Sequence, residues 1–249
     1  MTAAQQSAAI APYRNLLLSL LPPGEVERIG SHLQPVSLAF KQRIYEPDQP
    51  IADVYFPESA VCSMICELAD GTMVETGTIG YEGVTGVPTA MTGARSASLT
   101  MCQIPGAAYR LPVAVLVREL NERDSGLMAV VHRYLHYFTA MLAQGSACNR
   151  AHAVDARLAR WLLMTHDRVD TDVFPLTQEF LGQMLGVQRP SVNIAAATLQ
   201  RAGFIEYTRG RISVLNRLGL ESAACDCYRY LAEQLERAIG RPLRATAAP

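Results

Sequence analysis

Residues 177–204 predict two short helices packed around a glycine, and this segment limits the possible folds more than any other part of the chain. Gly186 suits the turn between the helices, and Gly182 provides the small side chain needed where two backbones touch. Thr177 is a favourable N-cap, and Pro190 fits the first turn of the second helix, where a missing N–H is tolerated. The facing apolar residues are Leu181, Leu185, Val187, Val192 and Ala195. This pattern is typical of a helix-turn-helix.

The residues that follow predict a wing and carry positive charge. FIEYTRGRISVL, residues 204–215, is typical of two short strands about a turn at residues 209–210. Between Gly186 and Arg211 there are four arginines and one acid, Glu206, whereas the whole chain has a formal net charge of -1. Because contacts with DNA phosphates need a local basic patch, this segment is the predicted nucleic-acid surface. A three-helix packing unit without a DNA role is the alternative.

The start of the second helix carries the predicted base contacts, because this part of a bound helix-turn-helix enters the major groove. Arg189 is the first candidate, since arginine can pair with both acceptors of guanine. Ile194 suits a thymine methyl group, and Ser191 or Arg209 suits a phosphate. With the N-cap and the wing included, the predicted DNA-binding residues are Thr177, Gln188, Arg189, Ser191, Asn193, Ile194, Arg209 and Arg211.

The N-terminal half, from about Leu33 to Leu111, predicts a compact all-β unit. Residues 54–56, 61–68, 73–79 and 98–104 carry β-branched and aromatic side chains between turn residues. The Asp-Gly pair at residues 70–71 indicates a hairpin, because both residues tolerate positive φ. A barrel or roll explains this spacing best.

A long helix follows, with Ser125 as a suitable N-cap and a run that continues to about Asn149. Steps of four and three residues place an apolar seam along it, and a helix of a second copy would fit that seam. The predicted dimer interface is Leu127, Val131, Tyr134, Phe138 and Met141. The alternative is that the seam packs on the β unit of the same chain, since periodicity does not show what covers an apolar face.

These elements predict three units: a sensor domain with flanking helices at 1–124, a dimerisation helix at 125–150, and a winged helix-turn-helix domain with a C-terminal helix at 151–249. The 49% hydrophobic and 18% charged residues fit a folded protein. No export signal and no stretch of about 20 apolar residues is evident, so we expect a cytoplasmic protein without a membrane partner. The scattered cysteines are expected to be free thiols.

Taken together, this arrangement resembles the CRP/FNR superfamily of bacterial transcription regulators. The resemblance is carried by LTQEFLGQMLGVQRPSVNIAAATLQRAGFIEYTRGRISV, residues 176–214, and by GYEGVTGVPTAMTGARSAS, residues 80–98. It implies an α+β chain with a double-stranded β-roll of the cyclic-nucleotide-binding type, a long dimerisation helix and a winged helix-turn-helix. It also implies a homodimer bound to double-stranded DNA with an inverted repeat, and it allows RNA polymerase as a partner.

The resemblance is incomplete at the effector site. Relatives that bind cyclic AMP hold the ribose and phosphate with a Gly-Glu pair and a later Arg-Ser pair. Arg95 and Ser96 are similar to the second pair, but Val84 follows Gly83 where the glutamate is expected, and a register that uses Glu82 makes the loop too long. A buried hydroxyl without its acceptor opposes binding by about 1–3 kcal/mol. These two pairs therefore mark an effector site that is unlike a cyclic AMP site, and a solvated or structurally paired arginine is the alternative.

Other cofactors have weaker support. The iron–sulfur branch of the family uses cysteines near the N-terminus, and this chain has none before Cys62. Haem stays open, because one histidine can supply an axial ligand. His132 and His136 lie one helical turn apart, although such residues usually pack or face solvent, and the C-x-C pair Cys225 and Cys227 does not by itself support redox chemistry. The residues therefore support no particular cofactor, with haem left open, and they predict no metal site.

The predicted function is a dimeric, sequence-specific regulator of transcription. Arg189 matches a family arginine, but Pro190 and Ile194 replace the glutamate and second arginine of the cyclic AMP activator, so the operator should differ from that activator's. No phosphate loop, nucleophile elbow or convincing metal motif indicates an enzyme. The alternative is a ligand- or partner-binding protein whose helix-turn-helix no longer reads DNA.

Overall fold

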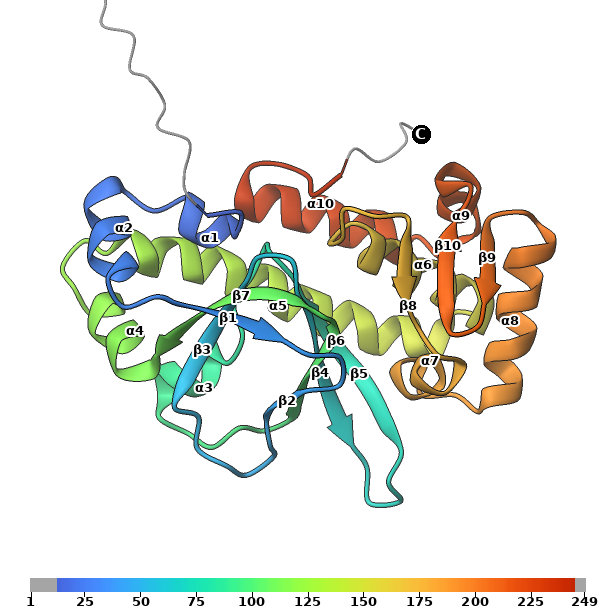
Figure 1. The fold of residues 1–249 in the computed structure, drawn as a ribbon, viewed down its shortest axis with the longest axis horizontal. Coiled ribbons are helices and arrows are strands. Elements are labelled where there is room, and N and C mark those ends of the chain that lie inside the picture. Colours follow the sequence, from blue (N-terminus) through green and yellow to red (C-terminus); the bar gives the residue numbers. More distant parts are fainter. Residues whose placement is uncertain (1–12, 245–249) are drawn as a thin grey trace, which may run out of the picture.

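The computed structural model describes residues 13–244, with a β-rich part and a helical part joined along one long helix (Figure 1). Two short helices, α1 (Leu16–Ser19) and α2 (Pro23–Gly30), precede the strands. One antiparallel sheet, in the order β1-β7-β3, is formed by β1 (Gln34–Leu38), β3 (Asp53–Pro57) and β7 (Gly106–Pro112). The second, in the order β2-β6-β4-β5, is formed by β2 (Arg43–Tyr45), β4 (Val61–Glu67), β5 (Met73–Ile79) and β6 (Leu99–Ile104).

The two sheets form the predicted roll. Strand β6 is buried at every position, because it has a strand on each side and lies over the core. The hairpin between β4 and β5 turns at Gly71, whose φ of 80° explains the glycine. The prediction of a hairpin at residues 70–71 is therefore confirmed.

Helix α3 (Val87–Thr92) lies between β5 and β6, and two helices, α4 (Val113–Leu120) and α5 (Gly126–Ala151), follow β7. Ser125 caps α5 by accepting a hydrogen bond from the backbone N–H of Met128, as predicted. Glu25 of α2 adds a second cap, since its carboxylate accepts the backbone N–H groups of Gly126 and Leu127 at 2.7 and 2.9 Å. A carboxylate at this end is also favoured by the helix dipole.

The apolar seam of α5 packs inside its own chain. The predicted dimer residues are all buried there, with exposed fractions of 7% or less: Leu127, Val131, Tyr134, Phe138 and Met141. The ring of Phe138 lies against Gly77 of β5, where an added Cβ would be 3.1 Å from the ring. In this structure these residues make the contacts of the alternative, packing on the β unit of the same chain.

The helical part begins with α6 (Val154–His166) and continues with β8 (Val173–Pro175), α7 (Gln178–Leu185), α8 (Arg189–Arg201), β9 (Ile205–Thr208) and β10 (Arg211–Val214). The chain then forms α9 (Arg217–Ala223) and α10 (Cys227–Ile239). The strands form a sheet in the order β8-β10-β9, of which the sequence predicted β9 and β10. Helix α10 turns back and packs along α5 (Figure 1).

The two parts are docked against each other through α6 and α7. Trp161 of α6 donates its indole N–H to Glu75 of β5. The rings of Phe40 and Phe180 lie 5.6 Å apart, and Lys41 lies over both rings. No helix in residues 13–244 is long and apolar enough to cross a membrane.

Candidate nucleic-acid interface

The helix-turn-helix is formed by α7 and α8, which meet where the sequence places small residues. Gly186 ends α7 with a φ of 62°, and an added Cβ at Gly182 would lie 3.0 Å from the carbonyl oxygen of Val187. Of the predicted facing residues, Val187 is half-buried and the others are buried, namely Leu181, Leu185, Val192 and Ala195. Local sequence therefore determines this crossing of two helices.

The start of α8 points away from the rest of the protein. Gln188, Arg189 and Asn193 are exposed, Ser191 is half-buried, and Ile194 is 69% exposed. An isoleucine this exposed gains nothing from burial in the free protein, and it suits an apolar contact such as a thymine methyl group. The predicted base-reading side chains thus share one accessible end of the helix.

The wing carries its arginines at an exposed turn. Arg209 has a positive φ of 47°, and Gly210 follows with a φ of 78°. The carbonyl of Gly210 accepts the N–H of Leu176 at 2.7 Å, which fixes the wing beside the start of α7. Arg211 opens β10 and is also exposed.

These arginines are free to bind an anion. Within residues 13–244, the side chains of Arg189, Arg209 and Arg211 form no hydrogen bond or ion pair. Thr177 differs, because its hydroxyl accepts the N–H of Phe180 as the N-cap of α7. Its position next to the wing still makes it part of this surface.

A groove separates the start of α8 from the tip of the β4–β5 hairpin. Gln188, Arg189 and Ser191 line one side, and Gly71, Thr72 and Met73 line the other. The hairpin therefore borders the candidate interface without covering it.

Each of the four predicted effector residues has contacts of its own in the described part of the chain. Arg95 is exposed, and its guanidinium donates to the backbone carbonyl of Asp48 at 2.6 Å, which matches the alternative of a structurally paired arginine. The hydroxyl of Ser96 donates to the carbonyl of Ser98. Gly83 lies against the Tyr134 ring of α5, so closely that an added Cβ would be 2.4 Å from its hydroxyl, and Val84 is buried.

Glu82, the glutamate next to this position, already has a partner. Its Oε1 lies 2.8 Å from a guanidinium nitrogen of Arg168, and both side chains are buried. Arg168 follows α6, so the ion pair joins the β-roll to the helical part. Burial alone would lower the pKa of Arg168, but the adjacent Glu82 carboxylate raises it overall and keeps the arginine charged.

The comparisons with known proteins agree with this geometry. Residues 156–223 match the Crp-like helix-turn-helix domain. The chain carries a Crp-like helix-turn-helix in a CRP/FNR-type fold. This confirms the predicted fold class, and it confirms the resemblance at the level of the fold and of the Crp-like domain. No curated protein matches the sequence significantly.

Solved structures show the same fold over most of the chain. FixK2 from Bradyrhizobium japonicum is 19% identical, with a TM-score of 0.62, covering 78% of this chain and 98% of its own. A CRP-family transcriptional regulator from Thermus thermophilus is 20% identical, with a TM-score of 0.62 and coverage of 85% and 100%. CLP from Xanthomonas campestris, a c-di-GMP responsive global regulator, is 14% identical, with a TM-score of 0.62 and coverage of 78% and 99%.

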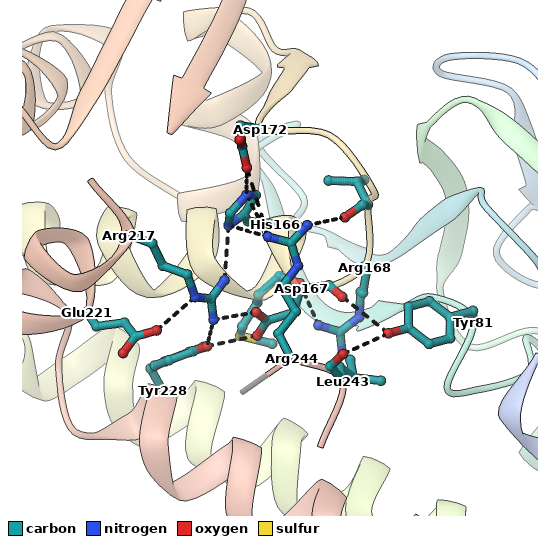
Figure 2. Close-up of polar contacts among 12 residues, drawn as sticks. Tyr81, His166, Asp167, Arg168, Asp172, Arg217, Glu221, Tyr228, Leu243 and Arg244 are labelled. Carbon is teal, nitrogen blue, oxygen red and sulfur yellow. Dashed lines mark hydrogen bonds and ion pairs between the residues drawn. The ribbon is translucent and has the colours of Figure 1, made fainter. Parts of the chain in front are cut away.

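A polar network holds α9, at the end of the Crp-like domain, and α10, which follows it, against the end of α6 (Figure 2). Arg217 of α9 donates to Asp167 at 2.7 Å and to Glu221 at 2.9 Å. Tyr228 of α10 donates its hydroxyl to the same Asp167 at 2.9 Å. His166, at the end of α6, lies between Arg217 and Asp172 in this network. Helix α9 is therefore bound to the end of α6, and α10 contacts α6 as well as packing on α5.

One group of residues beside the Crp-like domain comes together only in the structure. This group consists of Cys148, His152, Cys225 and Cys227. One potential ligand atom from each residue lies within 4.8 Å of those from the other three. Cys148 and His152 are four residues apart, a spacing that brings two side chains to the same side of a helix. Together with the C-x-C pair, this spacing was a signal in the sequence for a set of metal ligands. The two pairs are separated by more than 70 residues, so only the fold shows that they meet.

Proposed function

We propose that this protein is a dimeric, sequence-specific DNA-binding regulator of transcription. Its Crp-like domain reads the major groove with the start of α8, and Arg209 and Arg211 of the wing contact phosphates. The β-roll is the sensor in this proposal. Such a regulator acts in the cytoplasm of a bacterium, where the chromosome lies.

The observation that carries the proposal is the exposed and unpaired state of Arg189 at the start of α8. An arginine held in an ion pair would have to break it before contacting guanine, whereas Arg189 has no such contact in the described residues. Ile194 and Asn193 are exposed on the same helix and extend the surface along the groove. Together these three side chains supply positive charge, hydrogen-bond donors and an apolar contact, and proteins recognise the edges of bases through such groups.

Dimerisation follows from the way such domains bind DNA. A two-fold dimer presents two copies of α8 about one helical turn of DNA apart, roughly 34 Å, so an inverted repeat is the natural target. The seam of α5 that faces its own chain is not available, which leaves the opposite face. A row with steps of three and four is exposed there: Ala129, His132, His136, Thr139, Ala143, Ser146 and Arg150.

The test is DNA binding measured by fluorescence anisotropy, with an operator selected from random sequence. For Arg189→Ala we expect affinity for the operator to fall by about 5- to 150-fold per half-site, equivalent to the 1–3 kcal/mol of a bidentate base contact, with little change on random DNA. For Arg211→Ala we expect equal losses on both DNAs and a salt slope smaller by about one. Arg123→Ala is the control, because Arg123 is 97% exposed between α4 and α5, far along the chain from the Crp-like domain.

Equal affinity of the unaltered protein for selected and random DNA would contradict the proposal and favour a ligand- or partner-binding protein. Equal losses on both DNAs for Arg189→Ala would reassign this arginine to the phosphates.

A further inference from the structure

A compact group of three thiols and one imidazole joins the end of α5 to the start of α10. Cys148 lies in the last turns of α5, and His152 is its C-cap. Cys225 and Cys227 lie between α9 and α10 and at the start of α10. The Sγ atoms of Cys148 and Cys225 are 3.5 Å apart, and Cys227 Sγ is 3.5 Å from Nδ1 of His152.

The distances fit a tetrahedral metal centre. With metal–sulfur bonds of about 2.3 Å, the ligand atoms of a tetrahedral site lie about 3.8 Å apart, and the four atoms here all lie within 4.8 Å of one another. Three thiolates and an imidazole are soft and borderline donors, which suit zinc and do not suit magnesium or calcium. We propose that Cys148, His152, Cys225 and Cys227 bind one Zn²⁺ as a closed structural site.

The groups around the ligands are arranged as in a metal site. His152 directs Nδ1 at Cys227, and its other ring nitrogen, Nε2, lies 3.4 Å from a carboxylate oxygen of Asp226. Metal-binding histidines commonly hold their second nitrogen in this way, which sets the tautomer that leaves the other nitrogen free. The side-chain amide of Gln144 donates to Cys227 Sγ at 3.1 Å. An N–H donor stabilises a thiolate in preference to a thiol.

Two buried arginines supply the charge that such a site requires. Zinc replaces the three thiol protons, which are released to solvent, so the complex of Zn²⁺ with three thiolates and neutral histidine has a net charge of -1. Arg157 and Arg160 are 6% and 8% exposed, and neither forms an ion pair with a carboxylate within residues 13–244. The Nε of each has no hydrogen-bond partner there.

The field of these arginines reaches the thiols. Arg160 lies close enough for its charge to act on the Cys148 Sγ, which is also in contact with the Cys225 Sγ. Arg160 also acts on Glu75 of β5, so its charge is shared between the two groups. A negative metal centre beside Arg157 and Arg160 offsets their burial, which a cluster of neutral thiols does not.

Packing alone explains the cluster less well. Buried cysteines often serve as small apolar residues. Here, however, the three thiols form a small cluster of their own, separate from the main core, and among the described residues Ala156 is the only partly buried hydrophobic neighbour. The half-exposed His152 adds a polar imidazole to the cluster, and apolar packing does not explain its presence there.

The site would tie together two elements that the Crp-like domain depends on. Helix α5 runs along the β-roll, and α10 contacts both α5 and α6. A metal bonded to residues from both ends fixes α10 in place and closes a loop of more than 70 residues. Loss of the metal is expected to release α10 first.

The experiment measures zinc in the full-length protein, purified with a reductant from cells supplied with zinc. Native mass spectrometry and elemental analysis should find one zinc per chain. After replacement by Co²⁺, the protein should show the thiolate-to-cobalt charge-transfer band and the strong d–d bands of a tetrahedral site. Cys225→Ser and His152→Ala should lose the stoichiometric zinc, whereas Cys66→Ser, which changes an exposed cysteine on β4, and His136→Ala, which changes an exposed histidine on α5, should keep it.

A second measurement avoids dependence on variants that fold poorly. Chelation of zinc from the unaltered protein should lower its melting temperature and increase amide exchange in α10, and added Zn²⁺ should reverse both changes. Less than one zinc per chain in the unaltered protein, or equal zinc loss in Cys66→Ser, would overturn the proposal. Iron with acid-labile sulfide in the purified protein would also overturn the proposal. A Cys148–Cys225 disulfide in protein purified under conditions that retain bound metal would overturn it as well.

Discussion

Glu82 and Arg168 place two opposite charges in the interior at the junction of the β-roll and the helical part. Arg168 is held further by hydrogen bonds to the carbonyl of Met164 at 2.6 Å and to the Tyr137 hydroxyl at 3.3 Å. The second carboxylate oxygen of Glu82 has no hydrogen-bond partner in the described residues. The guanidinium of Arg168 thus has several hydrogen-bond partners, whereas one of the two carboxylate oxygens of Glu82 has none in the described residues. Its role at this junction is positional, since a buried pair is weak support for stability by itself.

Removal of one partner should be costly, because it leaves the other charge buried and alone. We expect Glu82→Gln to lower the free energy of unfolding by about 3–5 kcal/mol. Arg168→Met should have a similar effect. The measurement is urea denaturation followed by circular dichroism.

The double variant Glu82→Gln/Arg168→Met tests the coupling. It should be destabilised by much less than the sum of the two single effects, because no charge is left unpaired. Strictly additive losses would show that the two side chains act independently of each other.

At the scale of elements, α5 has two different faces. One face, with large apolar side chains such as Tyr134 and Phe138, is buried against the β-roll of the same chain. The opposite row consists of small and polar residues, among them Ala129, Thr139 and Ala143. Small side chains allow two helices to approach closely around a two-fold axis.

A bulky charge in the middle of this row should therefore separate the protomers. We expect Ala143→Glu to shift the protein from dimer to monomer in sedimentation velocity and to weaken binding to an inverted repeat. Ala94→Glu, an exposed alanine in the β-roll, is the control and should leave the dimer intact. A dimer that persists in Ala143→Glu would place the interface elsewhere.

At the scale of the whole molecule, the Crp-like domain is docked on the β-roll rather than connected by a linker. Phe40 and Lys41 of the roll contact Phe180 of α7, and Val74 of β5 lies where a Cβ on Gly186 would be 2.8 Å away. The start of α8 follows directly after Gly186. A change in the roll that moves β5 would therefore reach the proposed DNA-reading end of α8 through direct contacts, and could shift the population between two arrangements.

Phe40→Ala removes the aromatic contact across this junction, which is worth about 0.5–1.5 kcal/mol beyond burial. We expect faster amide exchange in α7 and a red shift in the emission of Trp161, the single tryptophan of the chain, which is buried at the same junction. Tyr230→Ala, a 42% exposed aromatic on α10, is the control. Unchanged exchange and emission in Phe40→Ala would mean that the contact does not hold the two parts together.

The local patterns of the sequence were sufficient for the β4–β5 hairpin, for α5, and for the helix-turn-helix with its wing, but not for β8. The turn at Gly186, the caps at Ser125 and Thr177, and the exposed Arg189 all follow from residues within a few positions of one another. Helix and turn formation depends on such short-range interactions, so the sequence alone determined them.

Tertiary structure alone decided what the apolar and reactive side chains meet. The spacing of apolar residues along α5 predicts that one face of this helix is buried. Only the fold shows that this face packs on the β-roll of the same chain. Glu82 and Arg168 are 86 residues apart, and Cys148 and Cys225 are 77 apart. No local rule connects residues at such separations, because their contact depends on the tertiary fold of the whole chain. The ion pair and the cysteine–histidine cluster therefore form only when the chain has folded.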